Sequence, residues 1–277
     1  VLATSVLALA AVLGAVLALG TASLRTSDDA EMMAAVSGYD GGARRPELLF
    51  TSVLVGRVLV GLYDLVPAAP WYGIYLHGLQ LVALTAIAVS LSVLLRGAPV
   101  AVVATVGLGL LLTAANAMMA VQFTIVGILL AIAGGLAFLA LRAAGRGVVL
   151  AGGVGAVLLW AAFLVRVQAF GLGLVLMGLL VVVRAAARRE ADVAGWTVIV
   201  AMTVTLIAAA TAAEQRWWSD EVGAGRPIPI WSSGLQSPPS STAGGGGGGG
   251  GRLSENDRAL MANWLIWPDE MFAYSPA

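Results

Sequence analysis

Three carboxylates stand within four residues near the start of the chain, in the run Asp28-Asp29-Ala30-Glu31. The whole chain of 277 residues has only fifteen acidic side chains, so this density is unusual. Asp28 and Glu31 have the spacing of a helix N-cap and its N3 partner, which predicts a short helix that stops near Gly38. Capping leaves Asp29 without a role, and an acidic pair can also act as a general base or hold a divalent cation. Both interpretations, cap and functional site, stay open at this point.

Cations that could bind an anionic substrate are spread along the chain. All fifteen basic residues are arginine, and a guanidinium can bind phosphate oxygens through two parallel hydrogen bonds. The candidates, on an amphipathic segment or near predicted outer turns, are Arg57, Arg166 and Arg216. Arg166 is equally well explained as an anchor that reaches the lipid headgroups from the end of a span.

Two further polar residues are candidates for contacts with a substrate, His77 and Gln122. His77 is the only histidine, and a packing role explains it more simply than catalysis. Gln122 flanks a predicted turn, where its amide satisfies exposed backbone groups or contacts a substrate. No group of His, Asp and Glu has the spacing of a metal site, so a divalent cation such as Mg²⁺ or Mn²⁺ is expected only through Asp28 and Asp29.

The composition places these residues in a membrane protein. The chain is 60% hydrophobic and 11% charged, with a mean hydropathy of +0.94, whereas a soluble domain is about a quarter charged. Its net charge of zero gives no electrostatic reason to bind nucleic acid. The absence of cysteine excludes disulfides and thiolate chemistry. The use of arginine without lysine, with abundant Ala, Val and Gly, is typical of a GC-rich bacterial genome.

Apolar segments of roughly the length that a helix needs to cross a bilayer recur along the chain. They cover residues 1–20, 48–66, 74–95, 98–114, 123–141, 147–165, 168–184 and 194–213. The first is uniformly apolar and long, which favours a retained span over a cleaved signal peptide. The segments 98–114, 123–141, 147–165 and 194–213 contain no ionisable residue, which argues against a proton-coupled transporter. Their glycines, including Gly152 and Gly155, predict close helix packing.

Segment 48–66 decides the topology. Arg57, Gly61 and Asp64 lie on one helical stripe, and charges at mid-span are costly, so we expect an amphipathic helix in the membrane interface. The alternative is an ordinary span with a buried Arg57–Asp64 pair. With seven crossings, the arginine loops near residues 96, 142–146 and 184–189 share one side, which the positive-inside rule makes cytoplasmic.

The sequence thus predicts an all-α, polytopic membrane protein of the bacterial plasma membrane, with about seven spans and one interfacial helix. Residues 1–213 form its transmembrane domain, with an outer loop at 21–73. Residues 214–251 form a flexible outer segment that ends in eight glycines. Residues 252–277 form a short amphipathic outer helix and the C-terminus.

An acidic pair after the first span, then an interfacial helix, then a Pro-aromatic entry into the next span resembles the GT-C class of membrane glycosyltransferases. The resemblance is carried by Asp28-Asp29, Met32-Met33, Ser37-Gly38, Leu62-Tyr63, Pro67 and Trp71-Tyr72, with weaker similarity at Gln122-Phe123-Thr124 and Ser254-Glu255-Asn256-Asp257. It covers the first outer loop and the topology. Many members have further spans or a large folded outer domain, whereas a short, glycine-tethered tail follows here.

The resemblance implies a function at the outer membrane face. Enzymes of this class take a sugar from a polyprenyl-phosphate carrier and transfer it to an acceptor, here expected to be an envelope glycan or glycolipid. One of Asp28 and Asp29 would be the general base, with Asp29 favoured if Asp28 caps the helix and the reverse order left open. Inversion at the anomeric carbon is implied, and arginines would neutralise the phosphate. The alternative function is that of a non-enzymatic membrane protein, either a transporter subunit or an assembly partner in a larger complex.

Overall fold

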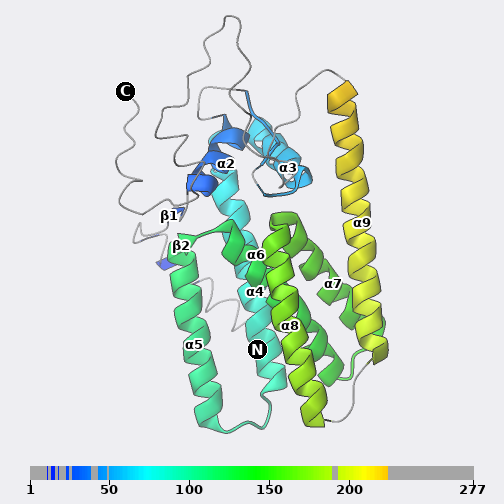
Figure 1. Cartoon of the computed structure of the whole chain (residues 1–277). Coiled ribbons are helices and arrows are strands. Elements are labelled where there is room, and N and C mark those ends of the chain that lie inside the picture. Colours follow the sequence, from blue (N-terminus) through cyan, green and yellow to red (C-terminus); the bar gives the residue numbers. More distant parts are fainter. Residues whose placement is uncertain are drawn as a thin grey trace, which may run out of the picture. The chain divides into compact units, whose positions relative to one another are not determined.

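The computed structural model describes residues 23–24, 27–38, 43–48, 50–188 and 193–223, with positions 11, 14, 15 and 18. This part of the chain is almost entirely helical (Figure 1). Its elements are β1 (Ser23–Leu24), α2 (Ser27–Ser37), α3 (Val53–Leu65), α4 (Trp71–Leu94), α5 (Val100–Met119), β2 (Ala120–Val121), α6 (Phe123–Ala143), α7 (Val148–Val165), α8 (Val167–Arg188) and α9 (Val193–Gly223). Most of the predicted first span 1–20, and all tail elements expected beyond residue 223, lie outside the described residues.

Five helical segments are long and apolar enough to cross a membrane: Trp71–Leu94, Val102–Met119, Phe123–Ala143, Val148–Val165 and Gly195–Asp220. Each overlaps a span expected from the sequence, which confirms the class of multi-pass helical membrane protein. α8 has 22 residues, within which Val167–Leu176 is a shorter apolar stretch. The total of seven crossings stays a prediction.

α9 is longer than its predicted span. It has 31 residues and continues to Gly223, whereas the apolar run ends at residue 213. Residues 214–223, which we expected to begin the flexible segment, are therefore helical.

α3 occupies the segment that decides the topology. It has 13 residues, or about 20 Å at 1.5 Å per residue, which is too short for the roughly 30 Å of hydrocarbon in a bilayer. Arg57, Gly61 and Asp64 are all exposed on it. The alternative of a buried Arg57–Asp64 pair is wrong, because Asp64 pairs with Arg44 and both side chains reach solvent.

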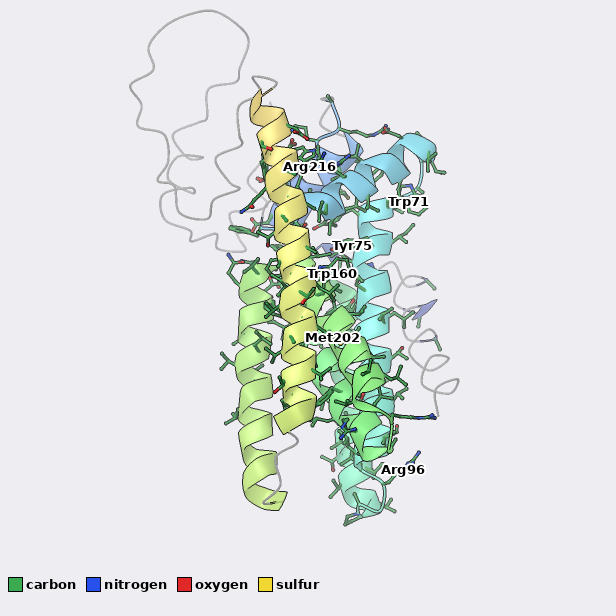
Figure 2. All side chains as sticks on the ribbon, turned by 90° about the vertical axis from the view of Figure 1, so that its right-hand side faces the viewer. Trp71, Tyr75, Arg96, Trp160, Met202 and Arg216 are labelled. Carbon is green, nitrogen blue, oxygen red and sulfur yellow. The ribbon has the colours of Figure 1, made fainter. Side chains whose placement is uncertain are left out.

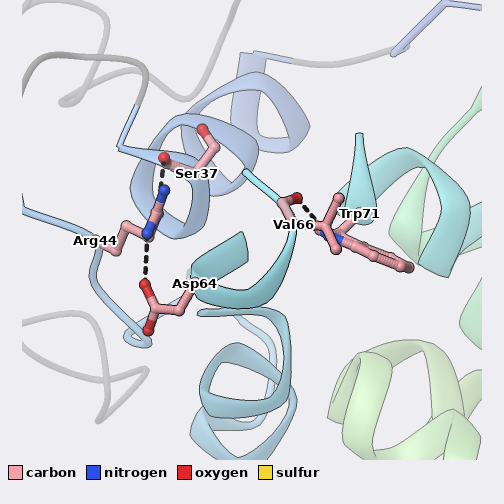
Figure 3. A network of polar contacts seen from close by, with 5 residues as sticks. All are labelled: Ser37, Arg44, Asp64, Val66 and Trp71. Carbon is pink, nitrogen blue, oxygen red and sulfur yellow. Dashed lines mark hydrogen bonds and ion pairs between the residues drawn. The ribbon is translucent and has the colours of Figure 1, made fainter. Parts of the chain in front are cut away.

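Polar contacts hold the loops around α3 in place (Figure 3). The Arg44 guanidinium donates one hydrogen bond to the last carbonyl of α2, at Ser37 (3.2 Å), and another to Asp64. The indole N–H of Trp71 donates to the Val66 carbonyl (3.0 Å) and closes the turn between α3 and α4. Because the Arg44–Asp64 pair is exposed, it contributes about 0–1 kcal/mol; its main effect is to order the loop.

α6 is the central helix and packs against α4, α7 and α8, while α7 packs against α9. Small residues let the helices approach closely, as predicted. A Cβ built on Gly155 would lie 3.0 Å from the Gly134 carbonyl oxygen and 2.5 Å from Ile199 Cδ1, and one built on Gly173 would lie 2.2 Å from Ala131 Cβ. Helices that pack through small residues gain dispersion contacts without needing a hydrophobic driving force.

The two ends of this helix array differ in charge. α2 and α3 lie at the end where α4 begins, and Figure 2 shows Trp71 and Arg216 at this end and Arg96 at the opposite one. Arg142, in the last turn of α6, and Arg146, in the loop before α7, lie at the same end as Arg96. Every carboxylate among the described residues lies in α2, α3, the loop between them or the last part of α9.

Candidate functional site

Asp28, Asp29, Glu31 and Arg166, at the α2–α3 end of the helix array, are called the polar layer below. Asp29 is its most buried member. Its side chain is fully buried. One carboxylate oxygen accepts a hydrogen bond from the Tyr72 hydroxyl (2.9 Å) and a longer one from the backbone N–H of Phe123 (3.4 Å). Burying a carboxylate is costly unless it is paired, so these contacts explain how the side chain is accommodated.

The two donors come from the first residues of two long helices. Phe123 is the first residue of α6, where a backbone N–H has no partner within its own helix, and the helix dipole there favours a negative charge. Gln122, the N-cap residue, makes no side-chain capping bond. Asp29 therefore caps α6 from 94 positions away in the sequence, which gives this carboxylate the role that helix capping within α2 left open.

Tyr72 links Asp29 to α3 as well. Tyr72 is buried at the start of α4, and its backbone N–H donates to the buried Tyr63 hydroxyl (3.2 Å). A short parallel pairing of β1 with β2, Ser23 with Ala120 and Leu24 with Val121, joins the same two regions of the chain. The position of α2 is thus fixed against α3, α4 and α6 together.

Asp28 has a different environment from Asp29. It lies in the first turn of α2, which begins at Ser27. The predicted N-cap at Asp28 is therefore wrong, because it would make the helix begin at residue 29. α2 ends at Ser37, and Gly38 follows with φ +74°, as the sequence predicts. The Asp28 side chain is half-buried, so the two carboxylates face different surroundings, as neighbours about 100° apart on a helix must.

Glu31 completes the acidic group. Partial burial raises the pKa of this carboxyl, which still reaches solvent, and the neighbouring charge of Asp28 raises it further. Both effects disfavour its ionised form.

Arg166 is the cation of this layer. It is the single residue between α7 and α8, and its guanidinium carbon lies 4.8 Å from the centre of the Phe50 ring and 4.6 Å from that of Phe123. Its Nη1 donates to the Thr124 hydroxyl. Burial lowers the pKa of Arg166, while Asp28 and Asp29 oppose that shift. The cation therefore lies in the field of both carboxylates and over two aromatic faces.

The segment 50–52 reaches the same place from the first loop. The Thr51 hydroxyl and the Ser52 N–H donate to the Val165 and Leu164 carbonyls at the end of α7 (both 2.9 Å). The Ser52 hydroxyl also donates to the Glu214 carboxylate of α9. Phe50, just before these anchors, has φ +60°, a left-handed conformation that costs a non-glycine residue about 1–2 kcal/mol.

Of the remaining predicted residues, Gln122 adjoins the Asp29 contact, whereas no contact with Asp28, Asp29 or Arg166 is seen for Arg57, Arg216 or His77 within the part of the chain that the structure describes. Arg57 on α3 and Arg216 on α9 are exposed. His77 is partly buried with Nδ1 2.9 Å from the Gly73 carbonyl oxygen of its own helix, a contact that fits the packing role. Gln122 precedes Phe123 and so lies beside the Asp29 contact. The structure thus brings Asp28, Asp29, Arg166 and Gln122 into one region.

Sequence reasoning missed three members of this region. Tyr72 and Thr124 belong to motifs that carried the resemblance, but no spacing rule links them to Asp29 or Arg166. Phe50 gave no signal, because left-handed backbone is normally marked by Gly or Asn.

No group of three or more metal-ligating side chains converges anywhere in the described ranges. A cation held by Asp28 and Asp29 would need further oxygen ligands, since Mg²⁺ and Mn²⁺ prefer octahedral sets. Comparison of the chain with protein-family models, with curated proteins and with solved structures finds no match.

Proposed function

We propose that the chain is a membrane glycosyltransferase that transfers a sugar from a polyprenyl-phosphate carrier to an envelope glycan or glycolipid on the outer face. The observation that carries the proposal is a cation, Arg166, over the Phe123 ring at the end of an apolar helix array, while the buried Asp29, next to the half-buried Asp28, accepts a hydrogen bond from the backbone of that same Phe123. A lipid-linked phosphate sugar presents these groups with both an anion and a reacting carbon at the membrane surface. The resemblance of the first outer loop to the GT-C class supports the same reaction.

In this proposal the two aspartates divide the work. Asp28 takes the proton from an acceptor hydroxyl as the hydroxyl oxygen attacks the anomeric carbon. The bond between that carbon and the phosphate oxygen breaks, and the carrier leaves as polyprenyl phosphate with the bonding electrons. Arg166 stabilises the charge that develops on the leaving phosphate. Asp29, buried against Tyr72 and Phe123, holds α2 and therefore Asp28 in position.

The distribution of charge supports an outward-facing site. Arg96, Arg142 and Arg146 lie at the end away from α2 and α3, and loops rich in arginine favour the cytoplasm. The site then faces outward in a bacterial plasma membrane. Arg57 and Arg216, both exposed at this end, are candidates for contacts with the carrier's headgroup region.

The alternative is a non-enzymatic assembly partner, and one observation favours it: Asp29 serves as a helix cap, the use expected of a structural carboxylate. Against it, the close helix contacts at Gly134, Gly155 and Gly173 are made within the chain.

The experiment is sugar transfer by the full chain reconstituted in liposomes with a radiolabelled polyprenyl-phosphate sugar and extracted envelope glycolipids as acceptors. We expect transfer by the wild type and none by Asp28→Asn at matched insertion. Exposed Arg45→Gln, in the loop before α3, serves as the matched charge control. Transfer that is equal in Asp28→Asn and wild type would favour the assembly partner.

A further inference from the structure

Phe50 has a strained backbone conformation, and its ring contacts Arg166. Among the described residues it is the one non-glycine position with positive φ, at +60°. Strained backbone persists only where the surroundings fix it, and it concentrates at functional positions. The residues that follow supply that fixation, since Thr51 and Ser52 are hydrogen-bonded to the last carbonyls of α7.

The left-handed turn brings the Phe50 ring over the Arg166 guanidinium, 4.8 Å from ring centre to Cζ. Phe123 supplies the second ring at 4.6 Å. Rings over a guanidinium leave its edges for hydrogen bonds. Of these edges, Nη1 is used by Thr124, and the buried Nε has no partner among the side chains and backbone described here.

We propose that Phe50 is a positioning residue that orients the Arg166 guanidinium so that its remaining edge binds the phosphate of a prenyl carrier. This inference rests on the proposed function and adds the residue that sets the geometry of its anion site. A turn alone would be formed with less strain by glycine, so the contact of the ring with Arg166 is what phenylalanine adds here. A fixed guanidinium loses less conformational entropy when it binds phosphate than a free side chain does.

The same full chain, purified in detergent, tests the inference by calorimetric titration with geranyl monophosphate. Geraniol and inorganic phosphate serve as comparison probes that separate recognition of the chain from recognition of the phosphate. The variants are Phe50→Gly, which suits the left-handed backbone, Phe50→Tyr, which keeps a ring, and Arg166→Gln. Phe138→Leu is the matched control, because Phe138 packs on Trp196 (ring centres 4.7 Å apart) near the other end of α6.

We expect Phe50→Gly to weaken binding of geranyl monophosphate by roughly five- to tenfold, the scale of one partly buried cation–π contact. Phe50→Tyr should bind within about twofold of wild type, because it restores that contact. Arg166→Gln should abolish binding of geranyl monophosphate. Geraniol, which has no phosphate, should bind wild type no more tightly than Arg166→Gln. Phe138→Leu should lower the melting temperature without changing the affinity for geranyl monophosphate.

Equal affinity of Phe50→Gly and wild type, or no binding of geranyl monophosphate by wild type, would overturn the inference. The two proposals can fail separately. Binding that depends on Phe50 in a chain without sugar transfer would refute the glycosyltransferase and keep the positioning role. Sugar transfer that depends on Asp28, together with equal binding by Phe50→Gly and wild type, would keep the glycosyltransferase and refute the positioning role of Phe50.

Discussion

At the residue scale, the two adjacent aspartates are separated by their environments. Asp29 is fully buried and accepts hydrogen bonds from α4 and α6, whereas Asp28 is half-buried. Identical side chains one position apart thus have different surroundings, and Asp29 joins α2 to the first turns of two long helices.

Replacing Asp29 with alanine should destabilise the fold by about 3 kcal/mol. The change leaves the Tyr72 hydroxyl and the Phe123 N–H without an acceptor, and a buried unpaired donor costs about 1–3 kcal/mol. Thermal unfolding in detergent measures the loss. In the Tyr72→Phe background the penalty should shrink, because one of the two orphaned donors is already gone; an unchanged penalty would contradict the hydrogen-bond account.

Glu31 should give the stability a dependence on pH. Its folded-state pKa is raised, so its contribution is fully present below the unfolded pKa and is lost as pH rises through the folded value. Glu31→Gln removes this loss. We therefore expect the variant to melt at a higher temperature than wild type at pH 7, with the difference vanishing near pH 4; a difference that grows on acidification would have the wrong sign.

In this region, local sequence rules predicted where α2 ends, but they could not predict contacts between distant parts of the chain. The α2 stop at Gly38 follows from local spacing. Asp28, Asp29 and Arg166 are sequence candidates together with other polar residues, and no spacing rule groups them. The contact of Asp29 with Phe123 joins residues 94 positions apart, and no local pattern encodes it. The left-handed Phe50 is likewise fixed by its tertiary anchors.

At the element scale, hydropathy predicts where the long helices lie in the sequence, and small residues allow these helices to pack closely. The five span-length segments overlap the apolar runs, because a run of apolar side chains and a span have the same length requirement. α9 extends past its apolar run into Glu214 and Arg216, which hydropathy cannot predict, since polar residues also form helix outside the bilayer. Glu214 contacts Ser52 there and ties α9 to the start of α3.

Gly155→Ala should separate α6, α7 and α9. The added Cβ would meet Ile199 Cδ1 at 2.5 Å and the Gly134 carbonyl oxygen at 3.0 Å, and overpacking of this kind costs about 1–3 kcal/mol. Gly109→Ala in α5 is the matched control, because no atom lies within 4 Å of its Cβ. Thermal unfolding of the two variants should show a loss for the first only; equal melting temperatures would contradict the packing described for α7.

At the scale of the whole molecule, the proposed function requires that the α2–α3 end of the helix array faces out. The chain contains no cysteine, so single cysteines report topology without background. Ala68→Cys lies in the exposed turn between α3 and α4, and Ala144→Cys in the exposed turn between α6 and α7. A membrane-impermeant maleimide should label the first in intact cells and the second only after permeabilisation. The reverse pattern would place the α2–α3 end, with Asp28 and Asp29, in the cytoplasm.

The central claim is that Asp28 reacts while Asp29 holds the structure. Sugar transfer and thermal unfolding, measured on the same preparations of Asp28→Asn and Asp29→Asn, test it most directly. We predict that Asp28→Asn changes the melting temperature less than Asp29→Asn does and loses transfer by about a hundredfold or more, as expected for a general base. Asp29→Asn should melt at a lower temperature and keep measurable transfer. Transfer that survives in Asp28→Asn and disappears in a stable Asp29→Asn would contradict the assignment.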